Sequence, residues 1–170
     1  MLALKEEIRR AREEAESQPV ANHVFETDAG EVKLSELFGD QEDLLVIHNM
    51  GKSCSYCTLW ADGLDALVPH LARRAAVVLV NGDPVDVQKS HAASRGWRNH
   101  RVVRDASGEF TRAVGMLTED GWMPGLSGFR KDASGVKMTG QTYFGPGDDF
   151  CGVWPAFELL EGGAKGWEPN

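Results

Sequence analysis

The stretch 44-LLVIHNMGKSCSYC-57 decides the expected fold, because it joins an apolar run to a pair of cysteines. Leu44 to His48 is apolar at successive positions, which is typical of a central parallel strand that is buried on both faces. Cys54 and Cys57 follow with Cys-x-x-Cys spacing at the predicted start of a helix. We expect Ser53 to be the N-cap of this helix and Cys54 to be its first residue. A dithiol between a strand and a helix is typical of thiol–disulfide exchange.

The spacing of the two cysteines suits that chemistry. The thiolate is the attacking species, and a free cysteine has a pKa of about 8.5. Unpaired backbone N–H groups at a helix N-terminus favour the anion, as would the ammonium of Lys52 if it lies close. Cys57 falls three residues after Cys54, on the same helix face and one turn deeper. We therefore predict that Cys54 is the nucleophile and that the more buried Cys57 resolves the mixed disulfide.

Two other interpretations of the cysteines stay open at this point. The first is a non-catalytic interaction module, in which both thiols serve only as small core residues. The second is a metal-binding module, but a closed zinc site needs four Cys or His ligands. The other candidate ligands have no pair with ligand spacing: Cys151, His48, His70, His91 and His100. We therefore predict neither a metal nor any other cofactor.

Downstream of the dithiol, strand and helix patterns alternate. The run 75–80 (AAVVLV) predicts a second buried strand, followed by a helix that ends at Gly96 and by a short strand at 101–104. A hairpin then spans 126–143, and a helix spans 150–161. This order predicts an α/β fold with a mixed central sheet and helices on both of its faces.

Upstream, the pattern predicts an N-terminal hairpin over residues 23–34 and an amphipathic helix over residues 2–17. The apolar face of that helix consists of Leu4, Ile8, Ala11 and Ala15. We expect residues 1–19 to form a helical arm, residues 20–162 one domain and residues 163–170 a loosely ordered tail. The arm could pack on its own domain or on a second chain, so a homodimer is one option.

Composition narrows the classes of partner. The chain has 170 residues, is 42% hydrophobic and carries a formal net charge of −8, which argues against nucleic acid and anionic membranes as partners. Its apolar runs are shorter than the roughly 18 residues that span a bilayer. The charged N-terminus does not resemble a secretion signal, so we expect a cytoplasmic protein with reduced thiols.

The arginines at 95, 98, 101 and 104 are expected to form a solvated, salt-bridged face. The expected partner is a protein or small-molecule disulfide or thiol.

The sequence resembles the thioredoxin-like superfamily. More closely, it is similar to a bacterial family of formerly uncharacterised proteins that are predicted to be dithiol–disulfide oxidoreductases. Four segments carry the resemblance: Cys54-Ser55-Tyr56-Cys57-Thr58-Leu59-Trp60-Ala61-Asp62-Gly63, Leu67-Val68-Pro69-His70-Leu71, Arg95-Gly96-Trp97 and Pro124-Gly125-Leu126-Ser127.

The resemblance implies the three-layer thioredoxin fold with a peroxiredoxin-like N-terminal hairpin. It also implies a cis-proline that precedes the third core strand and faces the dithiol, and Pro124 occupies the matching position. Thioredoxins have a tryptophan directly before the first cysteine, and this sequence has Ser53 there. Peroxiredoxins have a threonine or serine three residues before the reactive cysteine, and this sequence has Gly51 there. We therefore do not expect a dedicated peroxidase. Trp122 and Met123 could line a substrate groove.

Overall fold

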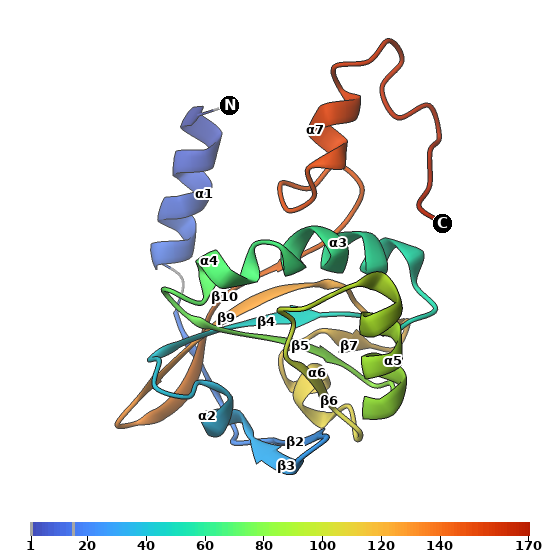
Figure 1. Ribbon diagram of the computed structural model, residues 1–170. Helices are drawn as coiled ribbons and strands as arrows, with labels where there is room; N and C mark the ends of the chain where they lie inside the picture. The colour runs from blue at the N-terminus through green and yellow to red at the C-terminus, as the bar shows by residue number, and fades with distance from the viewer. Residues whose placement is uncertain (1, 15) are drawn as a thin grey trace.

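The computed structural model describes residues 2–14 and 16–170 and has a mixed α/β architecture (Figure 1). Within these residues, one sheet contains eight strands: β1 (Gln18–Val20), β2 (Val24–Thr27), β3 (Gly30–Lys33), β4 (Asp43–His48), β5 (Ala76–Asn81), β6 (Val102–Arg104), β9 (Gly125–Asp132) and β10 (Gly135–Tyr143). Their order across the sheet is β1-β10-β9-β4-β5-β6-β2-β3. A separate two-stranded hairpin consists of β7 (Leu117–Thr118) and β8 (Gly121–Trp122).

The centre of the sheet is parallel and its two sides are antiparallel. β4 pairs with β5 in parallel, and β5 pairs with β6 in parallel, whereas β9 runs antiparallel to β4. The predicted N-terminal hairpin is present as β2–β3 and joins the sheet through β6. The carboxyl ends of β4, β5 and β6 consequently meet at one edge of the sheet, which is where ligands bind in open α/β sheets.

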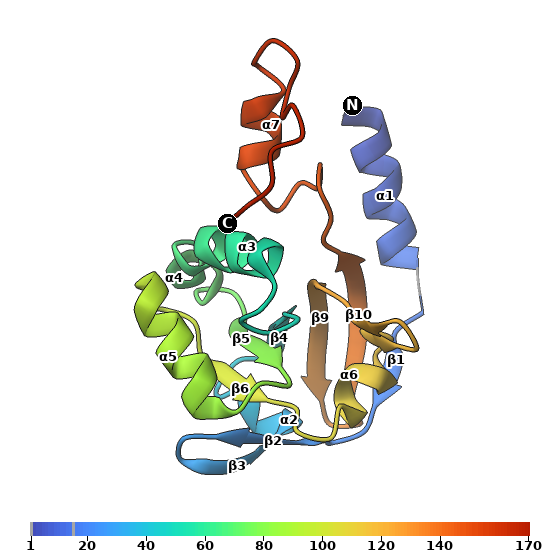
Figure 2. The ribbon, with the colours of Figure 1, turned by 90° about the vertical axis from the view of Figure 1, so that its right-hand side faces the viewer.

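Helices cover both faces of the sheet (Figures 1 and 2). The helices are α1 (Leu2–Glu14), α2 (Leu34–Leu37), α3 (Ser55–Asp65), α4 (Val68–Leu71), α5 (Val85–Arg95), α6 (Glu109–Ala113) and α7 (Val153–Phe157). α3, α4 and α5 lie on one face, and α2 and α6 lie on the other (Figure 2). α1 and α7 extend away from the sheet on the α3 side (Figure 1). This layering confirms the predicted α/β fold, with a mixed central sheet and helices on both of its faces.

The middle of strand β4, Leu44 to Ile47, is apolar at every position because it contributes to two cores. Leu44 and Val46 belong to the core on the α2–α6 face, which includes Phe110 and Phe129. Ile47 points the other way and packs with Trp60 in the core beneath α3. Alternate side chains of a strand point to opposite faces, so a strand between two helical layers needs apolar residues at every position.

The helix after the dithiol is interrupted before Pro69, at the point where a proline inside the helical pattern predicts a kink or break. The helix that begins after Cys54 ends at Asp65, and Pro69 lies in the first turn of the separate helix α4, where its missing N–H costs nothing. α7 is much shorter than the predicted helix at 150–161. Trp167 nevertheless packs its ring edge-on against Trp154 and Phe157, so the C-terminal segment folds back onto α7.

The N-terminal helix is present but contributes little to the core. Leu4 is 61% exposed and Ile8 is 42% exposed, while Lys5 forms an ion pair with Asp149 at 3.2 Å. Ala15, the last position of the predicted apolar face, lies outside the described residues. Pro19 follows the helix and lies in β1, the edge strand that pairs with β10. An edge strand tolerates proline, since one row of its backbone groups has no partner strand.

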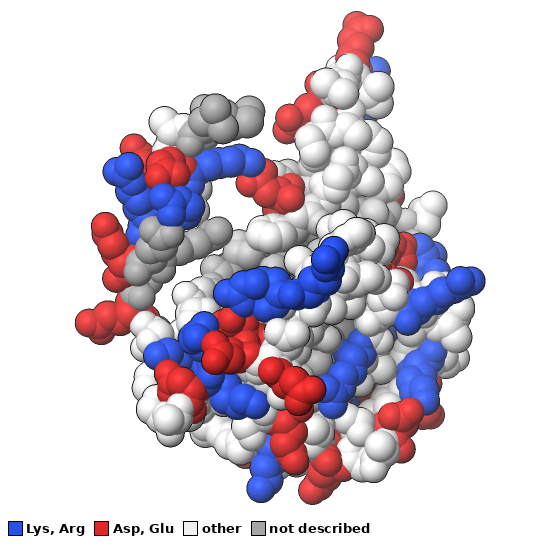
Figure 3. Space-filling model, turned by 60° about the vertical axis from the view of Figure 1, so that its left-hand side comes forward, with Lys and Arg blue, Asp and Glu red and all other residues white. Residues whose placement is uncertain are grey.

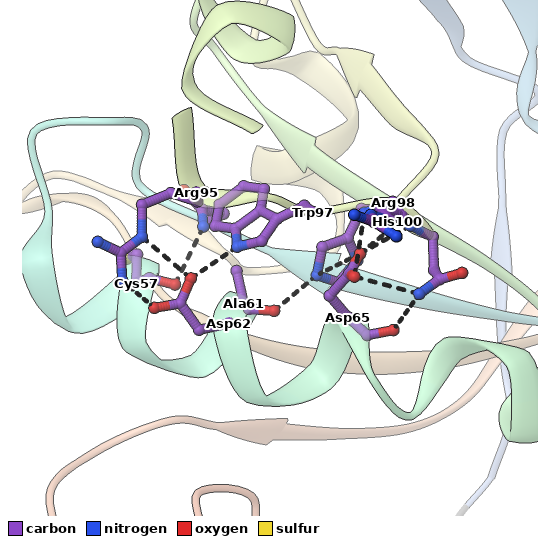
Figure 4. A network of polar contacts seen from close by, with 10 residues as sticks. Cys57, Ala61, Asp62, Asp65, Arg95, Trp97, Arg98 and His100 are labelled. Atoms are coloured by element: carbon purple, nitrogen blue, oxygen red, sulfur yellow. Dashed lines mark hydrogen bonds and ion pairs between the residues drawn. The ribbon is translucent and has the colours of Figure 1, made fainter. Parts of the chain in front are cut away.

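Two aspartates fasten α3 to the segment between α5 and β6 (Figure 4). The carboxylate of Asp65 accepts hydrogen bonds from the backbone N–H groups of Arg98, Asn99 and His100 at 2.9–3.1 Å. One turn earlier, Asp62 binds the indole N–H of Trp97 at 2.7 Å and the guanidinium of Arg95. Burial raises the pKa of Asp65, but the three N–H donors together bring it below 3.8. These contacts fix the position of the helix that begins at the dithiol.

Replacing Asp65 by alanine should destabilise the fold. The Asp65→Ala variant leaves three backbone N–H groups without their acceptor, and we expect the free energy of unfolding to fall by about 2–4 kcal/mol. Asp62→Ala is the matched comparison, since it leaves one N–H, the indole of Trp97, without its acceptor and removes a partly exposed ion pair with Arg95, so we expect a smaller loss of about 1–2 kcal/mol. Urea unfolding of both variants measures the difference. Equal losses would contradict the anchoring role given to Asp65.

Candidate active site

Cys54 is the N-cap of α3, one residue later than predicted. Its backbone is extended, with φ −94° and ψ 104°, and α3 begins at Ser55. The sulfur of Cys54 accepts a hydrogen bond from the backbone N–H of Cys57 at 3.1 Å. The prediction of Ser53 as the N-cap is therefore wrong. The Cys-x-x-Cys spacing matches the distance from an N-cap to its third helical residue, so the sulfur takes the place that a serine or aspartate oxygen has in most caps.

The two thiols differ in exposure as predicted. Cys54 is partly exposed, whereas Cys57 is only 2% exposed. The sulfur of Cys57 accepts a hydrogen bond from the backbone N–H of Met50 at 3.3 Å. Both thiols are free, so the structure represents the reduced dithiol.

The pKa values of the two thiols move in opposite directions. The thiol of Cys57 donates a hydrogen bond to the sulfur of Cys54, and this bond does most to lower the pKa of Cys54 to about 6. Burial opposes the shift, while the backbone N–H groups of Cys57 and Tyr56 add to it. The same thiol–thiol hydrogen bond raises the pKa of Cys57, and burial raises it further. At neutral pH the pair therefore holds a thiolate on Cys54 and a proton on Cys57.

The loop between β4 and the dithiol is held by side chains from two neighbouring strand ends. Asn49 accepts the backbone N–H of Gly51 at 2.8 Å, and its amide donates to the carbonyl of Cys57 at 3.4 Å. From the end of β5, the carboxylate of Asp83 accepts the backbone N–H of Lys52 at 2.8 Å. Lys52 contributes its backbone amide to this contact.

Gly51 is required where the loop passes Asp83. Its φ is +99°, a conformation that other residues rarely adopt. A Cβ at this position would lie 2.7 Å from the Oδ2 atom of Asp83. The close approach allows Asp83 to reach the next backbone amide, that of Lys52.

Pro124 lies at the same edge of the sheet, but its geometry differs from the prediction. Gly125 pairs with His48, which places Pro124 one residue beyond the pair, beside the start of the dithiol loop. Its carbonyl accepts the backbone N–H of Phe144 at 2.9 Å. All peptide bonds in the described part of the chain are trans, so the prediction of a cis bond between Met123 and Pro124 is wrong. The backbone on both sides of this bond is held by pairing, since the N–H of Met123 donates to the carbonyl of Met116 at 2.8 Å, and trans is the ordinary form of an X–Pro bond.

Several residues near the site were not singled out by sequence reasoning. Asn49 and Asp83 are the clearest cases, since both hold the dithiol loop. Their position directly after two buried strands could have identified them, because the carboxyl ends of those strands meet at one edge of the sheet. Thr58 is another, because its hydroxyl lies 3.2 Å from the carbonyl of Cys54 and 3.1 Å from the Nε2 atom of His91. The pattern of the sequence alone gave no sign that His91 lies beside α3.

The remaining candidate residues have structural roles. His48 is buried and lies 2.8 Å from the hydroxyl of Ser127, and burial lowers its pKa to about 3. Trp60 and Cys151 are buried in the core beneath α3. Within residues 2–14 and 16–170, no group of three or more His, Cys, Asp or Glu side chains is placed to hold a metal ion. None of the described helices combines the length and apolar character needed to cross a membrane.

The arginine cluster is partly paired. Arg95 forms an ion pair with Asp62, and Arg104 forms one with Glu26 at 2.9 Å, so the prediction of a salt-bridged face is confirmed for these two residues. On the face shown in Figure 3, basic and acidic side chains alternate and do not gather into one basic patch.

Comparison with known proteins places the chain at the level of family and fold. The model of a family described as "Bacterial protein of unknown function (DUF899)" matches residues 3–168. No curated protein sequence matches the chain significantly. The bacterioferritin comigratory protein of Xanthomonas campestris is similar in structure, with a TM-score of 0.60 and 16% identity over 74% of this chain and 84% of that one.

Two further peroxiredoxins show the same likeness. Peroxidoxin BcpB of Mycobacterium tuberculosis has a TM-score of 0.60 and 23% identity over 75% of this chain and 84% of its own. The 1-Cys peroxiredoxin of Plasmodium falciparum has a TM-score of 0.62 and 15% identity over 76% and 83%. At these identities the likeness establishes the thioredoxin-like fold, and the chemistry has to be argued from the site itself.

The reactivity of Cys54 should follow a titration near pH 6. Because its pKa is lowered to about 6, the rate of alkylation by iodoacetamide should rise through that pH and level off near neutrality. Cys57→Ala removes the largest cause of the shift, so the midpoint should move up towards the ordinary cysteine value of about 8.5. Cys57→Ser keeps a hydrogen-bond donor at this position and should therefore move the midpoint less. An unchanged midpoint in Cys57→Ala would refute the thiol–thiol hydrogen bond.

Gly51→Ala should disturb the dithiol loop. The substitution forces a Cβ against Asp83 in a left-handed backbone, and we expect it to lower the free energy of unfolding by about 1–3 kcal/mol. Gly63→Ala is the control, because Gly63 lies inside α3 with open space around its Cβ position, and should stabilise the protein by about 0.5–1 kcal/mol. The midpoint of urea unfolding should therefore fall in Gly51→Ala and rise in Gly63→Ala. A shift in the same direction in both variants would count against this account of Gly51.

Proposed function

The chain belongs to the bacterial family of unknown function DUF899, and we propose that it is a thiol–disulfide oxidoreductase that uses Cys54 and Cys57. The observation that carries the proposal is the cap of α3, in which the Cys57 backbone N–H and thiol both bind the Cys54 sulfur. A lowered cysteine pKa at a partly exposed helix N-terminus is what an attacking thiolate needs.

The first step uses the thiolate of Cys54. It attacks one sulfur of a substrate disulfide, forms a mixed disulfide with it and releases the other sulfur as a thiolate, which takes a proton from water. Cys57 then attacks the sulfur of Cys54. The Cys54–Cys57 disulfide forms, and the second substrate thiol leaves. The dithiol gives up two electrons in total, and an external thiol reductant must return them for another turnover.

The geometry makes Cys57 reactive only after Cys54 has reacted. The hydrogen bond to the Cys54 sulfur is the largest cause that raises the pKa of Cys57, and the negative charge of Cys54 adds to it. Both causes end when Cys54 enters a mixed disulfide. The backbone N–H of Met50 still lowers the pKa of Cys57, so the second thiolate forms beside the bond that it must attack.

A hydroperoxide is the competing substrate, because the similar Xanthomonas campestris protein has alkyl peroxide reduction activity. The residues around Cys54 favour a disulfide. Gly51 stands where the peroxiredoxin pattern has a hydroxyl residue, and the resolving thiol already binds the Cys54 sulfur. Oxidation of the reduced protein by an alkyl hydroperoxide and by a small disulfide, measured side by side, ranks the two substrates.

Single cysteine variants test the assignment of roles. Cys54→Ser should abolish reduction of insulin disulfides, because the attacking thiolate is lost, whereas Cys57→Ser should accumulate a mixed disulfide that mass spectrometry detects. Cys151→Ser is the matched control and should keep the activity of the wild type, since Cys151 is buried in the core beneath α3. Full activity in Cys54→Ser would overturn the proposal and favour the non-catalytic interaction module.

A further inference from the structure

A cavity of about 380 Å³ opens beside the dithiol loop. Its walls come from the segments that follow three parallel strands: Met50 after β4, Gly82 and Asp83 after β5, and residues 106–108 after β6. It therefore lies at the edge of the sheet where open α/β sheets bind their ligands. Met50 connects the cavity to the dithiol, because its backbone N–H binds the sulfur of Cys57.

The hairpin β7–β8 closes the far side of the cavity with two apolar side chains. Leu117 and Trp122 line it, and the indole ring lies so near Gly82 that a Cβ there would come within 2.9 Å of the ring. A Cβ at Gly108 would come within 2.7 Å of Leu117. The two glycines let the hairpin pack against bare backbone. Of the predicted groove residues, Trp122 lines the cavity, whereas Met123 packs against the core on the α2–α6 face.

The described side chains that line the cavity carry only negative charge. The described residues that line it include Asp83 and no lysine or arginine. Asp83 is fixed at the wall, since its N–H binds Asn81 at 3.0 Å, its carbonyl accepts from Gln88 at 2.8 Å and its carboxylate binds the backbone of Lys52. The guanidinium of Arg104 reaches the outside of the wall, at the carbonyl of Gly82, but it is paired with Glu26.

A cavity that is lined by both a fixed aspartate and a tryptophan suits a cation. The carboxylate attracts an ammonium group by charge, and the face of tryptophan attracts it through the ring quadrupole. A volume of about 380 Å³ lies near the lower end of the roughly 300–1,000 Å³ of ligand pockets, so the cavity has room for one short arm of a substrate.

We propose that this cavity is the substrate subsite of the dithiol and that it selects disulfides with a positively charged group close to the sulfur. The inference rests on the proposed function and adds the substrate class to it. The cationic arm occupies the cavity between Asp83 and Trp122, while the disulfide faces Cys54. Attack by the Cys54 thiolate then forms a mixed disulfide with the cationic half, and the other half leaves as a thiol. Anionic disulfides are disfavoured by the same carboxylate.

Three small disulfides of similar length test the proposal. They are cystamine, which is cationic, bis(2-hydroxyethyl) disulfide, which is neutral, and 3,3′-dithiodipropionate, which is anionic. The rate at which each oxidises the reduced protein is followed by stopped-flow fluorescence. Their leaving thiols differ in intrinsic reactivity, so the informative quantity is the change in the cationic-to-anionic rate ratio between variants. We expect Asp83→Asn to lower this ratio about 3- to 10-fold.

Asp86→Asn is the matched control, because it removes the same charge from the exposed first turn of α5, outside the cavity lining. It should change the ratio less than about twofold. A second measurement varies the salt concentration with the wild-type protein, so it does not require that a variant folds. Raising the salt to about 1 M should slow cystamine and speed dithiodipropionate, because it shortens the screening length to about 3 Å.

The outcomes separate the inference from the proposed function. Reaction with the neutral disulfide, dependent on Cys54, supports the proposed function whatever the charge preference. A ratio that is the same in Asp83→Asn and the wild type, or equal salt effects on cystamine and dithiodipropionate, would overturn the subsite. A lysine-flanked peptide disulfide, compared with cystamine in the same variants, tells whether the cation belongs to a polypeptide or to a small molecule. If the oxidation rate with either the peptide disulfide or cystamine depends on Asp83, the subsite is upheld.

Discussion

The hydrogen bond from the backbone N–H of Cys57 to the sulfur of Cys54 joins the fold to the chemistry. It caps α3, so it exists only when the helix begins at Ser55. It also adds to the lowering of the Cys54 pKa, of which the Cys57 thiol is the largest cause. Whatever sets the position of α3 consequently sets the charge of the nucleophile. The packing of Trp60 against the sheet and the anchoring of Asp65 act on the site in this way.

The dithiol loop depends on a second constraint, which comes from the parallel centre of the sheet. Three strand ends meet at one edge, and the segments after β4 and β5 hold the loop that carries the cysteines. Asn49 folds the loop back on itself, and Asp83 holds its backbone at Lys52. The contact with Asp83 leaves room for no side chain at Gly51. Asp83 also lines the cavity, so one residue both shapes the loop and gives the cavity its charge.

The fold alone does not choose between the activities that it supports. The similar solved structures are peroxiredoxins, yet the residues next to Cys54 differ from the peroxiredoxin pattern at Gly51. The distinction lies in what surrounds the sulfur. A second thiol that is buried, protonated and bound to the first one prepares the pair for exchange between sulfurs. The trans bond before Pro124 marks another departure from the thioredoxin pattern at this edge of the sheet.

The sequence by itself determined the order of the central elements, the N-terminal hairpin and the identity of the dithiol. Those features follow from local patterns, such as the uninterrupted apolar run of β4 and the spacing of Cys54 and Cys57. Short strands such as β7 and β8 left no such pattern, because two residues cannot show a period. Only the tertiary structure decided the N-cap, the trans geometry at Pro124 and the roles of Asn49 and Asp83. The contact of Asp83 with the amide of Lys52 spans 31 residues and forms only when β4 and β5 pair, because pairing brings the ends of the two strands together.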